Sequence, residues 1–190
     1  MRERLDPYRE HDLVARAAYE AEAFRDLYNH YFPKVYAYVA YRVQHRQDTE
    51  DLVSEIFLVV TERIHDFEYR GENTFSAWIF KIAFHVVSRF RRQQARQPLA
   101  SLDSLPEIKG NDLLPDQTIM RKERFLELVR LVDTLPPRRQ EVITLRYFAG
   151  LRNQEIAQVL GLDERTVASH ISRGLKQLYQ RFAPESEQNR

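Results

Sequence analysis

A short segment near the C-terminal end combines helical hydrophobic spacing with a central glycine, and few folds satisfy that pattern. Between Asn153 and Lys176, apolar residues recur where two short helices would bury one shared face: Ile156, Ala157, Leu160, Leu162, Val167 and Ile171. Gly161 lies between the two halves and has the backbone freedom that a sharp turn requires. The spacing therefore predicts a helix-turn-helix.

The second of these helices has an outer face suited to a nucleic acid. Cations and hydroxyl groups fall on one side of it: Arg165, Thr166, Ser169, Arg173 and Lys176. Side chains of these kinds meet base edges and phosphates in the major groove of DNA. The alternative interpretation is a helical hairpin that closes a C-terminal core and leaves a solvated outer face.

Composition indicates a folded, helical protein. The chain is 43% hydrophobic and 12% aromatic, with only 5 glycines and no clear alternating apolar pattern. The absence of cysteine excludes disulfides and thiolate metal sites. The longest stretch without acids or bases, residues 73–80, is too short for a membrane span, and the first residues lack the apolar core of a signal peptide. We therefore expect a cytoplasmic protein without membrane insertion.

A stretch of turn-forming residues divides the chain. From Gln97 to Gln117 helical periodicity lapses, and prolines and a glycine intervene at Pro98, Pro106, Gly110 and Pro115. We predict an all-α fold with two small helical domains, over residues 12–94 and 118–183, joined by an extended linker over residues 95–117.

Periodicity and capping residues predict the individual helices. Those of the first domain are expected near residues 12–31, 33–44, 49–66 and 75–92. Pro33 suits a first helical position, Asp48 or Thr49 can cap the third helix, and Thr74 can cap the fourth. In the second domain, an amphipathic helix through residues 125–131 is followed by a break at residues 135–137, a helix from 138 to near Gly150, and the helix-turn-helix.

Charge is segregated along the first domain, although the formal net charge of the chain is only +1. Residues 48–68 contain seven acids and one arginine, whereas residues 69–97 contain six bases and one acid. Neighbouring blocks of opposite sign indicate either two surfaces for two partners or two helices that neutralise each other.

The helix expected at residues 75–92 has two distinct faces. One broad arc is apolar and core-forming: Phe75, Ile79, Ile82, Ala83, Val86, Val87 and Phe90. The opposing arc carries Lys81, His85, Ser88, Arg89 and Arg92, with Trp78 at its margin. Such cations can hold phosphates and such a ring can stack on an unpaired base, although Trp78 could equally be a core anchor. The polar loop before this helix, residues 69–74, could form a pocket for a base edge.

Three motifs in order resemble one protein family. Residues 48–57, 69–83 and 135–151 are similar to motifs of the extracytoplasmic-function sigma factors of bacterial RNA polymerase, which are group IV of the sigma-70 family. The resemblance extends from about Phe24 to Phe182. This family consists of two helical domains, called regions 2 and 4.

The resemblance implies a function and a set of site residues. The chain would be an alternative sigma factor, not an enzyme, with no cofactor or metal, that binds core polymerase and directs promoter-specific initiation. Residues implied to recognise and melt the minus-ten element are Tyr69, Arg70, Gly71, Asn73, Thr74, Trp78, Lys81, His85, Arg89 and Arg92. Those implied to read the minus-thirty-five element are Arg138, Asn153, Arg165, Thr166, Ser169, His170, Arg173 and Lys176.

The resemblance also implies protein partners. Asp48, Asp51, Leu52, Glu55 and Leu58 would dock on the coiled coil of the polymerase beta-prime subunit. The second domain would rest on the flap of the beta subunit, and an anti-sigma protein would hold the factor inactive. His85 replaces a frequent asparagine of the family, and Ala168 and His170 replace frequent cations.

Two other classes of function are open to such a chain. An ordinary transcriptional regulator would bind DNA through the second domain only and would need no polymerase docking. An enzyme fits poorly, because the six histidines are scattered without metal-ligand spacing and no phosphate loop or nucleophile motif occurs.

Overall fold

The first helix begins earlier than the periodicity predicted. The computed structural model describes residues 5–71, 74–96 and 127–182, and in it α1 (Pro7–Ala17) precedes a break at residues 18–20. The Asp6 carboxylate accepts hydrogen bonds from the backbone N–H groups of Tyr8, at 3.0 Å, and Arg9, at 3.2 Å. An aspartate cap followed by proline at the first helical position is a local start signal. The predicted helix over residues 12–31 is therefore wrong at both ends.

The next helix runs through a proline. α2 (Ala21–Val43) is continuous across Pro33, where a new helix was predicted. An interior proline removes one hydrogen bond and costs about 3 kcal/mol. Burial of residues on both sides of it, including Leu27, Tyr31, Val35 and Tyr38, offsets that cost. The helix ends where Gln44 adopts a left-handed conformation with φ of 61°.

The acidic and basic blocks form neighbouring helices. α3 (Arg46–Arg63) continues into a short 3₁₀ turn, η1 (Ile64–Asp66), and α4 (Thr74–Gln94) packs against it. His45 caps α3 by accepting from the Asp48 N–H at 3.4 Å, so Asp48 and Thr49 lie inside the helix and are not its cap. Thr74 is likewise the first residue of α4, and its hydroxyl donates to the Gly71 carbonyl at 2.7 Å. Helical periodicity predicts a core-facing stripe on α3 as well: Leu52, Ile56, Val59, Val60 and Ile64. This stripe and the apolar arc of α4 are buried, apart from partly exposed Val59, Ile82 and Phe90.

The second group of helices contains the predicted helix-turn-helix. Helical residues 127–133 lead to α6 (Pro137–Tyr147), α7 (Asn153–Leu160) and α8 (Glu164–Phe182). Gly161 ends α7 with φ of 64°, which confirms the turn. Gly174 of α8 packs so closely on α6 that an added Cβ would lie 3.1 Å from the Ile143 side chain. A side chain there would require the Ile143 side chain to shift by a few tenths of an ångström.

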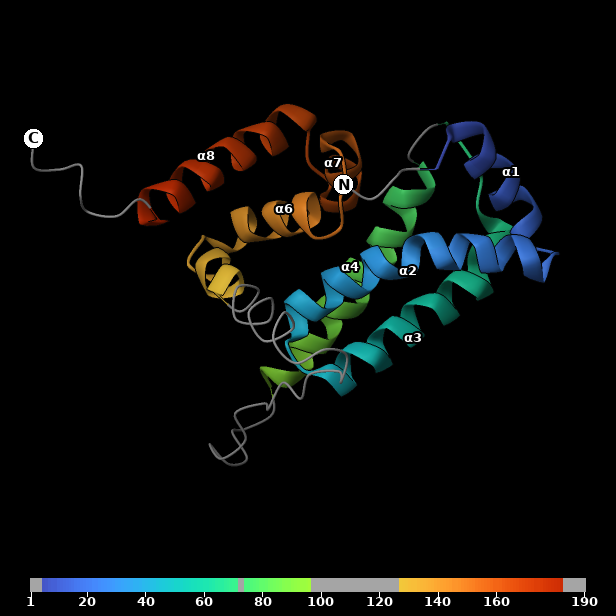
Figure 1. Ribbon diagram of the computed structural model, residues 1–190, viewed down its shortest axis with the longest axis horizontal. Helices are drawn as coiled ribbons and strands as arrows, with labels where there is room; N and C mark the ends of the chain where they lie inside the picture. Colours follow the sequence, from blue (N-terminus) through green and yellow to red (C-terminus); the bar gives the residue numbers. More distant parts are fainter. Residues whose placement is uncertain (1–4, 72–73, 97–126, 183–190) are drawn as a thin grey trace, which may run out of the picture.

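The two groups of helices pack against each other and share one apolar core. α2, α3 and α4 lie alongside one another with α1 across one end, and α6 to α8 form the second group (Figure 1). Val142, Leu145, Leu151 and Ile156 join the core of the first group. The predicted linker, apart from its first two residues, lies outside the described residues. Within the described residues, no helix has both the length and the apolar character needed to cross a bilayer.

Buried polar contacts cross this interface. Glu141 of α6 accepts a hydrogen bond from the Tyr38 hydroxyl at 2.9 Å and pairs with Arg42 at 2.8 Å. The charged side chains are only 8% and 9% exposed. Burial, and then the charge of Glu141, raises the pKa of Tyr38. A buried pair of this kind favours one relative arrangement of the two groups, because misplacing either partner leaves an uncompensated charge.

Candidate nucleic-acid and polymerase interfaces

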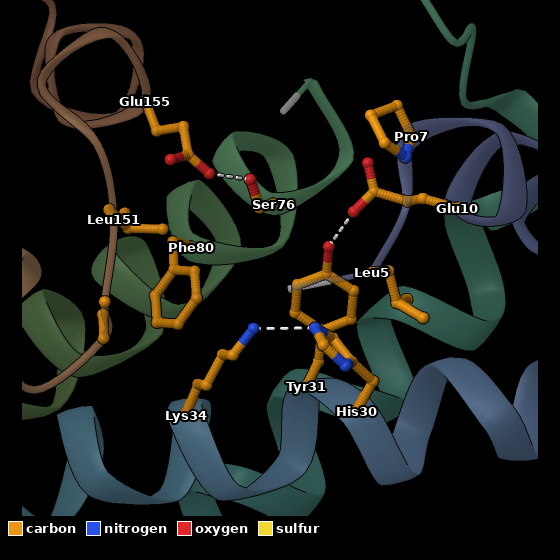
Figure 2. A pocket seen from close by; sticks show the side chains of 12 residues that line it. Leu5, Pro7, Glu10, His30, Tyr31, Lys34, Ser76, Phe80, Leu151 and Glu155 are labelled. Carbon is orange, nitrogen blue, oxygen red and sulfur yellow. Dashed lines mark hydrogen bonds between the residues drawn. The ribbon is translucent and has the colours of Figure 1, made fainter. Parts of the chain in front are cut away.

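The loop between η1 and α4 is tied to α1 through Tyr69. The Tyr69 hydroxyl lies 3.4 Å from both the Pro7 carbonyl and the Glu10 carboxylate, and its ring lies 4.6 Å from the His11 ring. The Glu10 carboxylate is buried and also accepts from the Tyr31 hydroxyl (Figure 2). The predicted base-reading loop is thus anchored at its first residue.

The rest of this loop is exposed in the described part. The Arg70 guanidinium pairs with Glu68 at 2.7 Å, and Gly71 has φ of 118°, a backbone conformation that favours glycine. Asn73, the predicted base contact, lies outside the described residues. The positive φ of Gly71 marks a sharp turn of the chain shortly before α4 begins.

A cavity of about 240 Å³ opens between α1 and the segment leading to the loop. Its wall contains several aromatic rings, and its lining residues are His11, Val14, Ala15, Ala18, Tyr19, Ile64, His65, Phe67 and Tyr69. Flat aromatic walls of this kind suit a planar heterocycle, since base and ring can stack. No cluster of histidines and carboxylates in the described residues could hold a metal ion.

Trp78 belongs partly to the core and partly to the surface. Its ring packs on Phe67 at 5.0 Å and on Phe75 at 5.5 Å between ring centroids, and it remains partly exposed. The core-anchor interpretation of Trp78 is therefore confirmed in part, and its stacking on an unpaired base stays a prediction.

The cationic face of α4 is exposed along its length. Lys81, His85, Arg89 and Arg92 are open to solvent, and at 1.5 Å per residue the helix from Thr74 to Arg92 spans about 27 Å. The Arg89 guanidinium is paired with the Glu55 carboxylate of α3. One predicted DNA contact is thus already bound to one predicted polymerase contact.

The acidic face of α3 contains most of the predicted docking residues. Asp51 is exposed, Glu55 is partly exposed, and Leu58 is 60% exposed although it is a large apolar residue. Asp48 lies 3.3 Å from the His45 ring. Leu52, by contrast, is only 6% exposed and packs in the core, so its assignment to this surface was wrong. On the helix it lies beside Asp48 and Glu55, at the edge of the buried face of α3.

The helix-turn-helix begins its second helix with an aspartate cap. The Asp163 carboxylate accepts hydrogen bonds from Thr166, from the backbone N–H at 2.7 Å and from the hydroxyl at 2.5 Å. These bonds hold the pKa of Asp163 below its ordinary value. The hydroxyl of Thr166 therefore donates to the cap, so with the cap intact it can meet a base only as an acceptor.

Cations from α6 and α8 converge around one histidine. Burial lowers the pKa of His170, and the positive charges of Arg139, Arg138 and Arg173 lower it further. None of the ion pairs in the described residues involves Arg138, Arg165, Arg173 or Lys176. The fold therefore brings Arg138 to the face of α8, and this face is more cationic than α8 alone indicates. Asn153 and Ser169, also predicted there, are partly buried.

Sequence reasoning missed three buried carboxylates, those of Glu10, Glu141 and Glu155. Glu155 had a local signal, because it stands at the third position of α7 and accepts from the backbone N–H of Arg152 at 2.6 Å. Ser76 of α4 also donates to it across the interface (Figure 2). Glu10 and Glu141 had none, since their partners come from other helices.

The cleft drawn in Figure 2 lies between the two groups of helices. Glu10 and Glu155 stand on opposite sides of it, and the Lys34 ammonium lies 2.7 Å from the His30 ring nitrogen. Its cavity volume is about 30 Å³, which is room for water and too little for an organic cofactor.

Comparisons with known proteins establish the family. The model of Sigma-70 region 2 matches residues 27–97, and that of Sigma-70, region 4 matches residues 125–178. The chain is 32% identical to the ECF RNA polymerase sigma factor SigX of Bacillus subtilis, covering 83% of this chain and 82% of that one. It is 34% identical to BldN of Streptomyces coelicolor, another such factor, covering 91% of this chain but only 66% of the relative. The chain therefore belongs to the extracytoplasmic-function sigma factors of the sigma-70 family, which are transcription initiation factors and not enzymes.

Solved structures share the fold. CnrH, determined in complex with the cytosolic domain of CnrY, superposes with a TM-score of 0.69 at 20% identity, covering 90% of this chain and 96% of that one. The sigma factor RpoE of Bartonella quintana, determined with the anti-sigma factor NepR, gives a TM-score of 0.61 at 19% identity over 83% and 94%. The all-helical architecture in two groups is thus confirmed.

Proposed function

We propose that this protein is an alternative sigma factor that binds core RNA polymerase, recognises and melts the minus-ten element with its first group of helices, and reads the minus-thirty-five element with α8. The observation that carries the proposal is the pair of separate cationic surfaces, on α4 and on α6 with α8, in one chain that also exposes an acidic docking face on α3. A simple repressor needs only one of these surfaces.

The minus-ten surface has a stacking site and a phosphate track. A nontemplate base that leaves the duplex would enter the loop region, where Tyr69 and Phe67 line the adjoining cavity. Lys81, His85 and Arg92 would hold the backbone of the neighbouring strand. Because the unpaired base exists only in melted DNA, its capture favours the open state.

The minus-thirty-five surface suits intact duplex. The exposed Arg165, Arg173 and Lys176 follow α8, which would lie in the major groove, and Arg138 would reach a flanking phosphate. Unpaired cations bind phosphates by releasing counterions, so affinity at this surface should fall steeply as salt rises.

Polymerase docking would use the exposed acids of α3. Asp51, Glu55 and Leu58 combine charge with an exposed apolar side chain, the composition of a protein contact. We assign them to the beta-prime coiled coil and the second group of helices to the beta flap.

The two groups of helices must separate for both promoter elements to be read at once. A compact chain of 190 residues measures about 40 Å across, whereas two elements about 25 base pairs apart are separated by about 85 Å of duplex. We therefore propose that polymerase binding opens the interface at Glu141 and holds the halves at the promoter spacing. Two weak DNA contacts on one scaffold then act together through their effective concentration.

An anti-sigma protein is the proposed inhibitor. One structural neighbour was determined with an anti-sigma factor, and a partner that binds both groups of helices would keep them packed as in Figure 1. We place the protein in the cytoplasm, where polymerase works.

Reconstituted transcription tests the function. Core polymerase plus this protein should initiate RNA on a subset of a genomic fragment library, and gel shifts on those promoters should need core polymerase. Tight, sequence-specific binding of promoter duplex by the protein alone would contradict the proposal and favour an ordinary regulator.

Charge reversal separates the two possibilities further. Asp51→Lys with Glu55→Lys should abolish binding to core polymerase if α3 docks there. The matched control is Glu22→Lys on α2, an exposed acid on another helix, which should leave transcription intact.

A further inference from the structure

Helix α1 lies outside the part of the chain that the region 2 family model matches, which begins at residue 27. Even so, α1 contacts the first residue of the loop in three ways. Tyr69 meets the Pro7 carbonyl, the Glu10 carboxylate and the His11 ring. No function proposed above accounts for this helix.

Glu10 links the loop to the core. Its side chain is 7% exposed, and it receives the hydroxyl of Tyr31, which is 2% exposed on α2. A buried carboxylate is costly unless donors surround it, so Glu10 is held where the two phenols converge. Through Glu10, Tyr69 is therefore held in place relative to α2, the central helix of the first group.

We propose that α1 is a brace for the base-reading loop and that Glu10 and His11 are positioning residues acting through Tyr69. The proposal rests on the capture of an unpaired base suggested above. Tyr69 opens the loop two residues before Gly71 and forms one wall of the 240 Å³ cavity, of which His11 forms another part. Without the brace the ring would sample other rotamers, and the cavity would lose its shape for a base.

Four variants separate the brace from folding and from direct DNA contact. His11→Ala removes the ring contact from an exposed side chain, so the fold is kept. Glu10→Ala removes the acceptor, whereas Glu10→Gln keeps one carbonyl acceptor and is the rescue. Tyr8→Ala is the matched control, an aromatic residue on the same helix that is 87% exposed.

Hydrogen exchange of the full chain measures the brace directly. In the segment 67–71, His11→Ala and Glu10→Ala should raise the exchange rate about two- to tenfold, the size expected from one aromatic contact. Glu10→Gln and Tyr8→Ala should match the wild type. Unchanged exchange in His11→Ala would overturn the brace, even if Glu10→Ala fails to fold.

Transcription with core polymerase then tests what the brace is for. On a promoter from the library and its single-base variants at the captured position, His11→Ala should lower the ratio of preferred to other bases about two- to tenfold at unchanged affinity for core. Asn73→Ala tests base capture itself. If Asn73→Ala lowers the ratio and His11→Ala does not, the brace is wrong and the proposed function stands. If neither variant lowers the ratio although His11→Ala raises the hydrogen-exchange rate of the segment 67–71, base capture by this loop is wrong. If Tyr8→Ala lowers the ratio as much as His11→Ala, α1 contacts DNA directly and the brace is wrong.

Discussion

The two proposed DNA surfaces differ in how their cations are held. On the first, Arg89 is paired with Glu55 and Arg70 with Glu68, whereas Lys81 and Arg92 form no ion pair among the described residues. On the second, Arg138, Arg173 and Lys176 form no ion pair among the described residues, and the pKa of His170 is lowered by burial and then by the neighbouring arginines. All cations of the second surface are therefore ready for phosphate, whereas on the first surface Arg70 and Arg89 must exchange partners.

This difference suits the two tasks proposed for the surfaces. A duplex element is bound as it stands, so bare cations and counterion release suffice. A melted element exists only after opening, and cations that are paired beforehand bind little to closed DNA. Because Glu55 also belongs to the proposed polymerase contact, docking on α3 would release Arg89 only within the complex.

The largest effect is expected on the free energy of unfolding, from a change at the interface where the two groups of helices pack together. Glu141→Ala leaves Arg42 buried without its partner, which should lower the free energy of unfolding by about 3 to 5 kcal/mol. Urea denaturation measures it. Replacing both charges, with Arg42→Met and Glu141→Leu, should recover much of the loss, because an apolar pair leaves no buried charge. If the single variant is as stable as the wild type, the buried pair does not hold the interface.

DNA binding by the second surface, whose cations form no ion pair, should show the strongest salt dependence. Arg173→Ala with Lys176→Ala removes two phosphate contacts, so the slope of log affinity against log salt should become shallower by about 1.8. Holoenzyme binding to a promoter fragment at several salt concentrations measures this slope. The matched change on the first surface, Arg70→Ala with Arg89→Ala, should alter it by less, since these two cations must first leave Glu68 and Glu55. Equal changes would erase the distinction between the surfaces.

Removing the ion-pair partner of Arg89 should make the first surface behave more like the second, with a cation that is free to bind phosphate. Glu55→Gln keeps the size of the side chain but removes the charge that holds Arg89, so holoenzyme should bind a pre-melted template about two- to fivefold more tightly, the size of a surface ion pair. The measurement is made at saturating core polymerase, because docking itself should weaken. Weaker binding to the pre-melted template would show that Glu55 orients Arg89 for DNA and does not compete for it.

The smallest effect concerns pH at the second surface. His170 has a lowered pKa in the free protein, and DNA phosphate nearby would raise it, so binding takes up a proton and affinity should rise as pH falls from 8 toward the ordinary histidine value of about 6.5. His170→Gln should flatten this rise in fluorescence titrations of the holoenzyme. The stability of the free protein depends on pH with the opposite sign. The unfolded chain binds that proton more readily, so stability falls as pH falls from the ordinary histidine value of about 6.5 toward the lowered pKa of folded His170.

Local patterns were enough to predict the helix-turn-helix, the buried faces of α3 and α4, and the acidic and basic blocks. The turn at Gly161 needs a left-handed backbone, and helix faces follow from a 3.6-residue period, so neighbouring residues contain that information. Asp6 and Pro7, which start α1, were an equally local signal. The prediction from periodicity did not use it.

The continuity of α2 through Pro33 and the partners of the charged groups depended on packing. Tyr38 and Glu141 stand 103 residues apart, and Tyr69 and Glu10 stand 59 apart. Such contacts arise only when distant helices meet, and burial then gives them an energy large enough to override local preference. Which cations are free and which are already paired is therefore a property of the folded chain.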